Sequence, residues 1–559
     1  MSTDFDVIVV GSGITGGWAA KELGERGLKV LLLERGRDVK HGDYPTEHAG
    51  PWTMPYRGMG DQERYKRDYP IQSTHFLFNE YCEHFFVNDR EAPYQCDPAR
   101  PFFWYRGNQV GGRSLIWGRH TYRWSDLDFE ANKRDGHGVD WPIRYQDLQP
   151  WYDHVEDFIG VSGQAEGLAH LPDGKFLPPM QFNCAEKLFK TRVEEKFHDR
   201  IVTIGRVAVL TQPHRGRGAC HYCGPCERGC SVGAYFSTQS STLPAAMATG
   251  NVTLLANHLV EKIVCDPLTG RATGVNAIAT DTRARHFVSA RMVFLCASAF
   301  ASTQILLNSA SEKHPGGIGH ASGALGHYLM DHTMSLSARA LMPGMQDRYY
   351  QGNRPNTMYI PRFRNVSAPQ EDFVRGYGYQ GLAWRGSWRR GIGDSGFGKD
   401  YKEALHKPGP WLIVLAALGE TLPRHENYLE LDAKHPDPFG IPQIKIHYSP
   451  GDNEARMMRD AKEQAVAMLA AAGAQVQAAT SDLLPSGSGI HEMGTARMGN
   501  DPASAVLNKH NQCHAAPNVF VTDGACMASG ACQNPSLTYM AITARACDFA
   551  ATELRAGRL

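Results

Sequence analysis

The stretch FDVIVVGSGITGGWAAKELGERGLKVLLLERG, residues 5–36, decides the fold of this chain. It reads as a short apolar strand, a glycine turn, a helix and a second strand that ends in Glu34. Gly11 permits the tight turn, Gly13 lets the backbone approach a pyrophosphate, and Gly16 lets helix and strand pack closely. Glu34 follows Gly16 by 18 residues, near the spacing of about 20 at which an acid binds a ribose. The stretch predicts a dinucleotide site and does not separate FAD from NAD.

Length and composition are typical of a globular protein with more than one domain. The chain has 559 residues, 42% of them hydrophobic and 21% charged, which is long for a single core. Lys plus Arg and Asp plus Glu both total 58, so no basic excess favours nucleic acid as a partner. The most apolar run, WLIVLAAL at 411–418, is far shorter than the roughly 20 residues of a membrane-spanning helix. We therefore expect no transmembrane segment, and the amino terminus shows no export signal of its own.

Further motifs follow in an order that resembles a known family. Residues 106–118 read RGNQVGGRSLIWG, residues 490–499 read IHEMGTARMG, and residues 518–546 read NVFVTDGACMASGACQNPSLTYMAITARA. Four more segments belong to the same pattern, namely DWPIRYQDLQPWYDHVE from 140, ANHLVEKIV from 256, ARMVFLCASAFASTQILLNS from 290 and ALGHYLMDH from 324. Over most of its length the chain is thus similar to the glucose–methanol–choline (GMC) oxidoreductases.

The resemblance implies an α/β fold in two parts. A Rossmann-like FAD-binding domain with a parallel sheet is expected from residues 1–45, 104–125, 236–328 and 485–559. A substrate domain with an antiparallel sheet covered by helices is expected from residues 46–103, 126–235 and 329–484. The β- and glycine-rich segments at both ends of the sequence agree with this division.

The resemblance also settles the expected cofactor as FAD. Pyranose oxidases join a histidine covalently to the flavin in the second glycine turn, where this chain has Ile116, so we expect FAD to be held non-covalently. The residues expected to contact it are Gly11, Gly13, Ile14, Thr15, Gly16, Glu34, Arg35, Gly111, Gly112, Ser114, Trp117, Gly118, Val260, Ala297, Asp523, Gly524, Asn534, Pro535 and Thr538.

Two residues near the carboxyl end carry the expected chemistry. GMC enzymes move a hydride from an alcohol carbon to the flavin, and a base must take the hydroxyl proton, a role that suits histidine. By motif resemblance this base is His491, while Asn534 holds the substrate oxygen by a hydrogen bond. Asn534 precedes Pro535, so it can also serve as a turn or capping residue.

Four of the 13 cysteines lie within eleven residues, in CHYCGPCERGC. Cys220, Cys223, Cys226 and Cys230 have the spacing C-x2-C-x2-C-x3-C, the ferredoxin-like order for an iron–sulfur cluster. The alternatives are zinc and disulfides or free thiols, although zinc sites usually use two separated C-x2-C pairs. Some GMC dehydrogenases carry a 3Fe–4S cluster on C-x5-C-x3-C. That pattern fits all but Cys223, which is either the fourth ligand of a 4Fe–4S cluster or a bystander. The expected insertion covers residues 215–236 of the substrate domain.

An iron–sulfur cluster indicates a dehydrogenase that passes electrons outward rather than to oxygen. The resemblance implies a small helper subunit and a cytochrome-type acceptor as partners. It also implies a periplasmic location by co-export with a signal-bearing partner, with a cytoplasmic location as the alternative.

The resemblance to the iron–sulfur sugar dehydrogenase branch, which includes glucoside 3-dehydrogenases and gluconate dehydrogenase large subunits, favours a sugar or glycoside oxidised to a 3-keto product. Four aromatic residues either stack on the sugar or pack in the core or a lid, namely Tyr377, Tyr379, Trp384 and Trp388. A sugar acid or polyol is the alternative substrate. A cluster of arginines would bind an acid or else forms a solvated face, namely Arg385, Arg389 and Arg390. An electron-transfer subunit without substrate chemistry is the alternative of another class.

Overall fold

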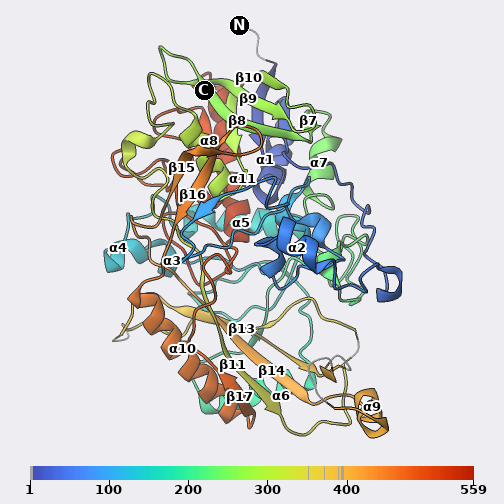
Figure 1. Ribbon diagram of the computed structural model, residues 1–559. Coiled ribbons are helices and arrows are strands. Elements are labelled where there is room, and N and C mark those ends of the chain that lie inside the picture. The colour runs from blue at the N-terminus through green and yellow to red at the C-terminus, as the bar shows by residue number, and fades with distance from the viewer. Residues whose placement is uncertain (1–3, 351, 370–371, 388–389, 392–395) are drawn as a thin grey trace.

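Two large β-sheets organise the molecule, one in the upper half of Figure 1 and one in the lower half. The computed structural model describes residues 4–350, 352–369, 372–387, 390–391 and 396–559. The first strand, β1 (Phe5–Val10), and the last helix, α11 (Ser536–Arg555), both lie with the upper sheet. Among the described residues, no helix has the length and apolar character needed to cross a bilayer.

The first sheet has a parallel centre. Its strands run in the order β7 (Val252–Leu255), β2 (Val30–Leu33), β1 (Phe5–Val10), β10 (Arg285–Leu295), β9 (Ala272–Ala279) and β8 (His258–Cys265), with β18 (Val519–Val521) also beside β10. The second half of β10 lies between β1 and β18 and is parallel to both, while its first half is antiparallel to β9. The sheet is therefore a parallel nucleotide-binding sheet extended by an antiparallel pair.

Alternation along β1 places this sheet between two apolar layers. Val7 and Val9 pack with α1 (Ile14–Glu25) and α11 (Ser536–Arg555), whereas Ile8 and Val10 belong to a second cluster. All four side chains are at most 4% exposed, and burying each contributes about 1.5–3 kcal/mol. After Asp6, the strand has four consecutive buried apolar residues, which is what a sheet buried on both faces requires.

The second sheet is antiparallel and is covered by helices on one face. Its strands run in the order β17 (Gln475–Ala479), β11 (Thr333–Met342), β14 (Trp411–Gly419), β13 (Tyr377–Arg385), β12 (Met358–Ile360) and β6 (Thr203–Ile204). Helices α10 (Asp452–Ala471) and α6 (Cys184–Lys196) pack on it (Figure 1). In α10 the buried residues Met457, Ala461, Ala465 and Met468 recur at helical spacing and form the contact stripe.

A small third sheet connects these layers. It consists of β15 (Tyr428–Pro436), β16 (Pro442–His447) and β3 (Gln95–Cys96), and it packs against α8 (Ala299–Asn308). Shorter elements fill the connections, among them α2 (Gln62–Asp68), α3 (Asp126–Phe129), α4 (Ala131–Asp135), α5 (Tyr145–Ile159), α7 (Thr242–Ala248), α9 (Lys399–His406), β4 (Val161–Ser162) and β5 (Phe176–Leu177).

The expected fold class is confirmed: a parallel nucleotide-binding sheet and an antiparallel sheet under helices occur in one chain. The strands of each large sheet fall within the sequence ranges expected for its domain. The exact domain boundaries stay a prediction.

Candidate active site

A cavity of about 510 Å³ takes its walls from both large sheets. On one side Val10, Leu33 and Cys296, at the carboxyl ends of β1, β2 and β10, open into it. On the other side Met334 of β11 and Gln380 of β13 face it. Cofactors of parallel α/β sheets bind outside the carboxyl ends of the strands, so the cavity lies where the opening motif predicts a dinucleotide.

The glycine turn has the shape that a dinucleotide needs. A Cβ on Gly16 would lie 1.7 Å from the Gly11 carbonyl oxygen, so only glycine allows this contact between α1 and the turn. A Cβ on Gly13 would meet no protein atom within 4 Å, because Gly13 borders the open cavity. No side chain caps the first turn of α1, so its amide groups and the helix dipole are available to a phosphate.

Glu34 is fixed at the end of β2. Its carboxylate accepts hydrogen bonds from the Ser12 amide at 3.0 Å, the Ser12 hydroxyl at 2.6 Å and the Gly36 amide at 2.8 Å. These bonds hold the carboxylate at the cavity wall, where a ribose hydroxyl can donate to it.

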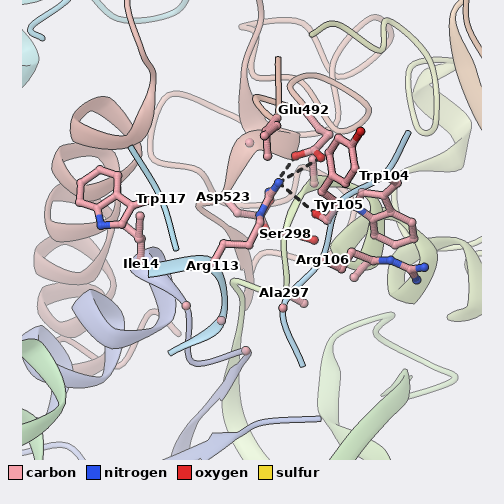
Figure 2. Close-up of a pocket in the computed structure, with 18 of the residues that line it drawn as sticks. Ile14, Trp104, Tyr105, Arg106, Arg113, Trp117, Ala297, Ser298, Glu492 and Asp523 are labelled. Carbon is pink, nitrogen blue, oxygen red and sulfur yellow. Dashed lines mark hydrogen bonds and ion pairs between the residues drawn. The ribbon is translucent and has the colours of Figure 1, made fainter. Parts of the chain in front are cut away.

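An ion pair forms another part of the wall. Arg113 binds Glu492 through two nitrogens, at 2.8 and 3.1 Å, and Figure 2 shows Arg113 also reaching Tyr105. Asp523 lies beside this pair in Figure 2, and its carboxylate accepts a hydrogen bond from the Ala525 amide at 3.0 Å. Burial raises the pKa of Asp523 to about 6.

Unpartnered polar atoms support the presence of a polar ligand in the cavity. The Tyr539 hydroxyl and Arg106 Nε are buried, have no hydrogen-bond partner within the described part of the chain and belong to residues that line the cavity. The Arg106 guanidinium lies 4.2 Å from the centre of the Trp104 ring, and both are at one side of Figure 2. Buried polar groups in proteins are almost always satisfied, so the residues present fit FAD.

His491 and Asn534 meet in the same cavity. His491 Nε2 is 3.4 Å from Asn534 Nδ2, and Asn534 Oδ1 accepts a 2.7 Å hydrogen bond from Gln380 Nε2. The other ring nitrogen of His491, Nδ1, is 2.7 Å from Nδ1 of His332. Burial lowers the pKa of His491 well below its ordinary value, and the nearby His332 and Arg113 act in the same direction. The His491 ring is therefore neutral and able to accept a proton.

Asp331 holds the backbone of the His491 loop. Its carboxylate accepts hydrogen bonds from the amides of His491 at 2.9 Å, His332 at 2.8 Å and Gly489 at 3.1 Å. Ile490, just before His491, has φ of 58°, a strained value for a β-branched residue. Strain of this kind persists only where surrounding contacts impose it, and here Asp331 binds the backbone on both sides of Ile490.

Most of the residues expected from sequence line the cavity, including His491. Those lining it are Gly11, Gly13, Ile14, Thr15, Glu34, Arg35, Gly112, Ser114, Trp117, Gly118, Val260, Ala297, Asp523, Gly524 and Asn534. Gly16, Gly111, Pro535 and Thr538 are not among its lining residues. Gly111 packs against Gln239, and the Thr538 hydroxyl is 2.8 Å from the Tyr152 hydroxyl. These four residues thus lie next to residues that line the cavity and do not line it themselves.

Sequence reasoning missed several residues of the site. Two of them contact the catalytic pair: His332 contacts His491, and Gln380 contacts Asn534. The others line the cavity, namely Arg113, Glu492 and Tyr539. Arg113 and Glu492 directly follow the recognised residues Gly112 and His491 in the chain, so their adjacency was an available signal. Gln380 carried no such signal.

The four cysteines of the loop differ in burial. Cys220, Cys226 and Cys230 are half-buried against one apolar cluster that contains Tyr235, while Cys223 is exposed. All 13 cysteines belong to the described residues, and no disulfide joins any two of them. Within the described residues, no group of three or more His, Cys, Asp or Glu side chains is arranged to hold a metal ion. The iron–sulfur cluster therefore stays a prediction.

Those aromatic and arginine candidates for sugar binding that the structure describes do not line the cavity. Tyr377 and Tyr379 point into the core under α10, where their hydroxyls donate to Asp460 and to the Ala461 carbonyl, each at 2.5 Å. Trp384 is half-buried and is not among the lining residues. Trp388 and Arg389 lie outside the described residues.

Both described arginines of the cluster are engaged by the backbone. Arg385 donates to four carbonyl oxygens, including those of Gly409 and Pro408. Arg390 donates to the carbonyl oxygens of Ala404 and Lys407 among others. Their guanidinium groups thus hold loops of the second sheet together through hydrogen bonds to backbone carbonyl oxygens.

Comparison with known proteins agrees with this site. Two family profiles, each described as GMC oxidoreductase, match residues 5–334 and 423–543. The chain is 28% identical to 2-methyl-1,2-propanediol dehydrogenase of Mycolicibacterium austroafricanum, over 97% of this chain and 94% of that protein. It is 24% identical to the fructose dehydrogenase large subunit of Gluconobacter japonicus, over 99% of this chain and 98% of that one.

A solved structure supports the fold. Pyridoxine 4-oxidase from Mesorbium loti aligns over 99% of both chains with a TM-score of 0.60 and 15% identity. At that identity the likeness concerns the fold alone. The profiles, in contrast, together span most of the sequence and include both the glycine turn and the His491 loop. The chain therefore belongs to the GMC oxidoreductase family.

Proposed function

We propose that this protein is an FAD-dependent dehydrogenase that oxidises a secondary hydroxyl of a sugar or glycoside, with C3 of a glucose-like ring as the favoured position. The observation that carries the proposal is the His491–Asn534 pair. Its two facing nitrogens are 3.4 Å apart at the wall of the cavity that carries the dinucleotide motif. A base and a hydrogen-bond donor at this separation can share one alcohol oxygen.

The chain's own residues supply the proton chemistry. Bound FAD would supply the hydride acceptor. His491 Nε2 takes the hydroxyl proton, and Asn534 Nδ2 donates a hydrogen bond to the oxygen as negative charge develops on it. Gln380 fixes the orientation of the Asn534 amide, because Gln380 Nε2 donates a hydrogen bond to Asn534 Oδ1 and so leaves Asn534 Nδ2 facing His491.

A sugar is supported by the polar part of the cavity wall. His75, His120 and Ser488 line the same cavity as the catalytic pair, and the similar fructose dehydrogenase large subunit is named for a sugar. Hydroxyls of a sugar ring need several such partners because unpaired polar groups are costly in a closed site.

A small branched diol is the second candidate, favoured by an apolar part of the same wall. Leu77, Met334 and Leu418 line the cavity, and the chain is 28% identical to a 2-methyl-1,2-propanediol dehydrogenase. A sugar acid has less support, because Arg385 and Arg390 are bound to carbonyl oxygens.

A substrate panel tests the proposal. Glucose, methyl glucoside, gluconate and 2-methyl-1,2-propanediol are each added to the oxygen-free holoenzyme, and bleaching of the flavin band is followed. Turnover is then measured with dichlorophenolindophenol, and NMR of the product identifies the oxidised carbon. We expect bleaching by the glucoside and a 3-keto product. Bleaching by the diol alone would select the second candidate, and no bleaching by any alcohol would favour an electron-transfer subunit.

His491→Ala is the matched control for this panel. The variant should keep its flavin spectrum and lose about 10²–10⁴-fold in the rate constant of flavin reduction. Near-normal reduction in this variant would remove His491 from the mechanism.

We propose that the cysteine loop holds an iron–sulfur cluster, which would supply one-electron transfer. Support comes from the apolar cluster of Tyr235, on which Cys220, Cys226 and Cys230 pack. The Arg119 guanidinium lies 5.1 Å from the centre of the Tyr235 ring, and Arg119 also lines the cavity. The loop and the cavity are thus separated by about the width of two side chains.

Metal analysis tests the cluster. Iron and acid-labile sulfide should be present in the protein purified without oxygen, whereas zinc would select the alternative. Cys226→Ser should remove the iron. Cys223→Ser should retain it if the cluster is 3Fe–4S, and EPR of the oxidised protein should then show a signal.

A cluster of this kind implies an acceptor protein, and we propose a cytochrome-type acceptor and a small helper subunit. The name "large subunit" of the fructose dehydrogenase relative supports an assembly of several chains. We further propose co-export to the periplasm with a signal-bearing partner, with a cytoplasmic location as the alternative. Fractionation of cells with and without the helper subunit distinguishes the two.

A further inference from the structure

His332 lies behind His491, on the side away from the cavity. It is 4% exposed and directly precedes β11. Its Nδ1 is 2.7 Å from His491 Nδ1, and its Nε2 is 2.5 Å from the Ala531 carbonyl oxygen. The two rings are perpendicular, at 89°, with centres 4.7 Å apart. Both ring nitrogens of His332 are therefore engaged by neighbours.

The partners of His332 determine where its proton is. A carbonyl oxygen only accepts, so Nε2 of His332 must carry a hydrogen to bind Ala531. Burial lowers the pKa of His332 to about 4, so the neutral ring carries no second hydrogen at neutral pH. Its Nδ1 then presents a lone pair towards His491.

The proton on His491 follows from this lone pair. Two imidazole nitrogens 2.7 Å apart attract each other only if one of them carries hydrogen. Because His332 Nδ1 has none, the hydrogen is on His491 Nδ1. His491 Nε2 is then bare, and this is the nitrogen beside Asn534 in the cavity. A base is useful only if its free lone pair faces the substrate.

We propose that His332 is the positioning residue that fixes the tautomer of His491, through the chain Ala531 carbonyl, His332, His491. The inference rests on the proposed role of His491 as the base. It also assigns a function to the charged state: after His491 takes the substrate proton, its Nδ1–H remains bonded to the His332 lone pair, which stabilises the imidazolium.

His332 differs in role from its neighbour Asp331. Asp331 binds the backbone amides at Gly489 and His491 and so places the loop. The ring of His491 is instead held by His332, whose Nδ1 lies 2.7 Å from His491 Nδ1. His332 itself does not line the cavity, and neither of its nitrogens is open to substrate. Two consecutive residues thus control the position and the proton of the same base.

Two nearly isosteric variants test this inference. In His332→Asn the side-chain oxygen can still accept from His491 Nδ1–H, whereas His332→Leu has the same branching and no acceptor. Both holoenzymes are mixed with the active alcohol without oxygen in a stopped-flow instrument. The rate constant of flavin reduction and the substrate dissociation constant are then obtained separately.

We expect His332→Leu to lower the reduction rate constant about 100-fold or more, since general-base catalysis is worth about 10²–10⁴-fold. Its substrate dissociation constant should change less than about threefold. His332→Asn should recover the rate constant to within about tenfold of the natural protein. Equal rate constants in the two variants, or a near-normal one in His332→Leu, would overturn the inference.

The outcome is separable from the proposed function. If His491→Ala still reduces the flavin normally, the proposed base is wrong. If only His332→Leu does so, the base stands and the positioning role falls. Should His332→Leu fail to fold, neutron diffraction of the natural holoenzyme decides: deuterium is expected on His491 Nδ1 and His332 Nε2, and deuterium on His332 Nδ1 would overturn the inference.

Discussion

Replacing Gly16 or Gly13 by alanine separates packing from cofactor binding within one turn. A Cβ on Gly16 would lie 1.7 Å from the Gly11 oxygen, and real Cβ atoms essentially never approach closer than 3.0 Å. Helix α1 would have to move by at least 1.3 Å to relieve this contact. A radial gap of 0.5–1 Å already removes about a quarter to a half of the dispersion energy of a contact.

Gly16→Ala should therefore lower the free energy of unfolding by about 3 kcal/mol, the upper end of the range for overpacked sites. The displaced helix would also carry its first turn away from the cavity. We expect a clearly lower thermal transition and little bound flavin, measured by calorimetry and by the ratio of flavin to protein absorbance. A stable, fully flavinated Gly16→Ala protein would refute the packing argument.

Gly13→Ala is the matched control. Gly13 has φ of −65° and ψ of −161°, which alanine tolerates, and its Cβ would meet no protein atom within 4 Å. The apoprotein should therefore unfold at the same temperature as the natural apoprotein. FAD should bind at least about tenfold more weakly, because the methyl group enters the space that the phosphates need. Unchanged FAD affinity would contradict the assignment of Gly13.

Three further predictions follow from single contacts. Gln380→Met removes the 2.7 Å bond to Asn534, worth about 1 kcal/mol, and should slow flavin reduction about five- to tenfold in stopped flow; an unchanged rate would show that Gln380 does not orient the amide. Burial raises the pKa of Glu22, but the hydrogen bond from His154 and nearby cations outweigh this and lower it from 4.5 to about 2. The ionised Glu22 carboxylate therefore stabilises the folded protein above pH 4.5, and this stabilisation is lost as the pH falls towards 2. The decrease in Tm caused by Glu22→Gln should be largest at pH 7 and should become smaller below pH 4.5. Ile116 cannot bond to a flavin, so acid precipitation should release the cofactor, and colour retained in the pellet would contradict non-covalent binding.

The sequence allowed prediction of those parts of the site that depend on local geometry. The roles of Gly11, Gly13 and Gly16 follow from one turn between a strand and a helix, and the structure has that turn with the expected close contact. Glu34 likewise ends the strand next to it. Such motifs are readable because their residues are neighbours in the chain.

Other parts depend on register and on distant contacts. Tyr377 and Tyr379 face the helices while Gln380 faces the cavity, because successive residues of a strand alternate between the two faces of a sheet. The sequence does not specify which face meets the cofactor domain. His332 contacts His491 across 159 positions of the chain, so only the folded structure shows that the two rings meet.

The alternation of the second sheet has an evolutionary consequence. Met334 and Leu418 are directly opposite each other on β11 and β14 and face the cavity, whereas the neighbouring residue Ala417 is part of the apolar core under α10. A mutation at 334 or 418 changes the shape offered to an alcohol and leaves that core and the glycine turn as they are. Lineages can therefore change the substrate on this wall while they keep the core under α10, and residues 334 and 418 are the natural positions for a directed-evolution library.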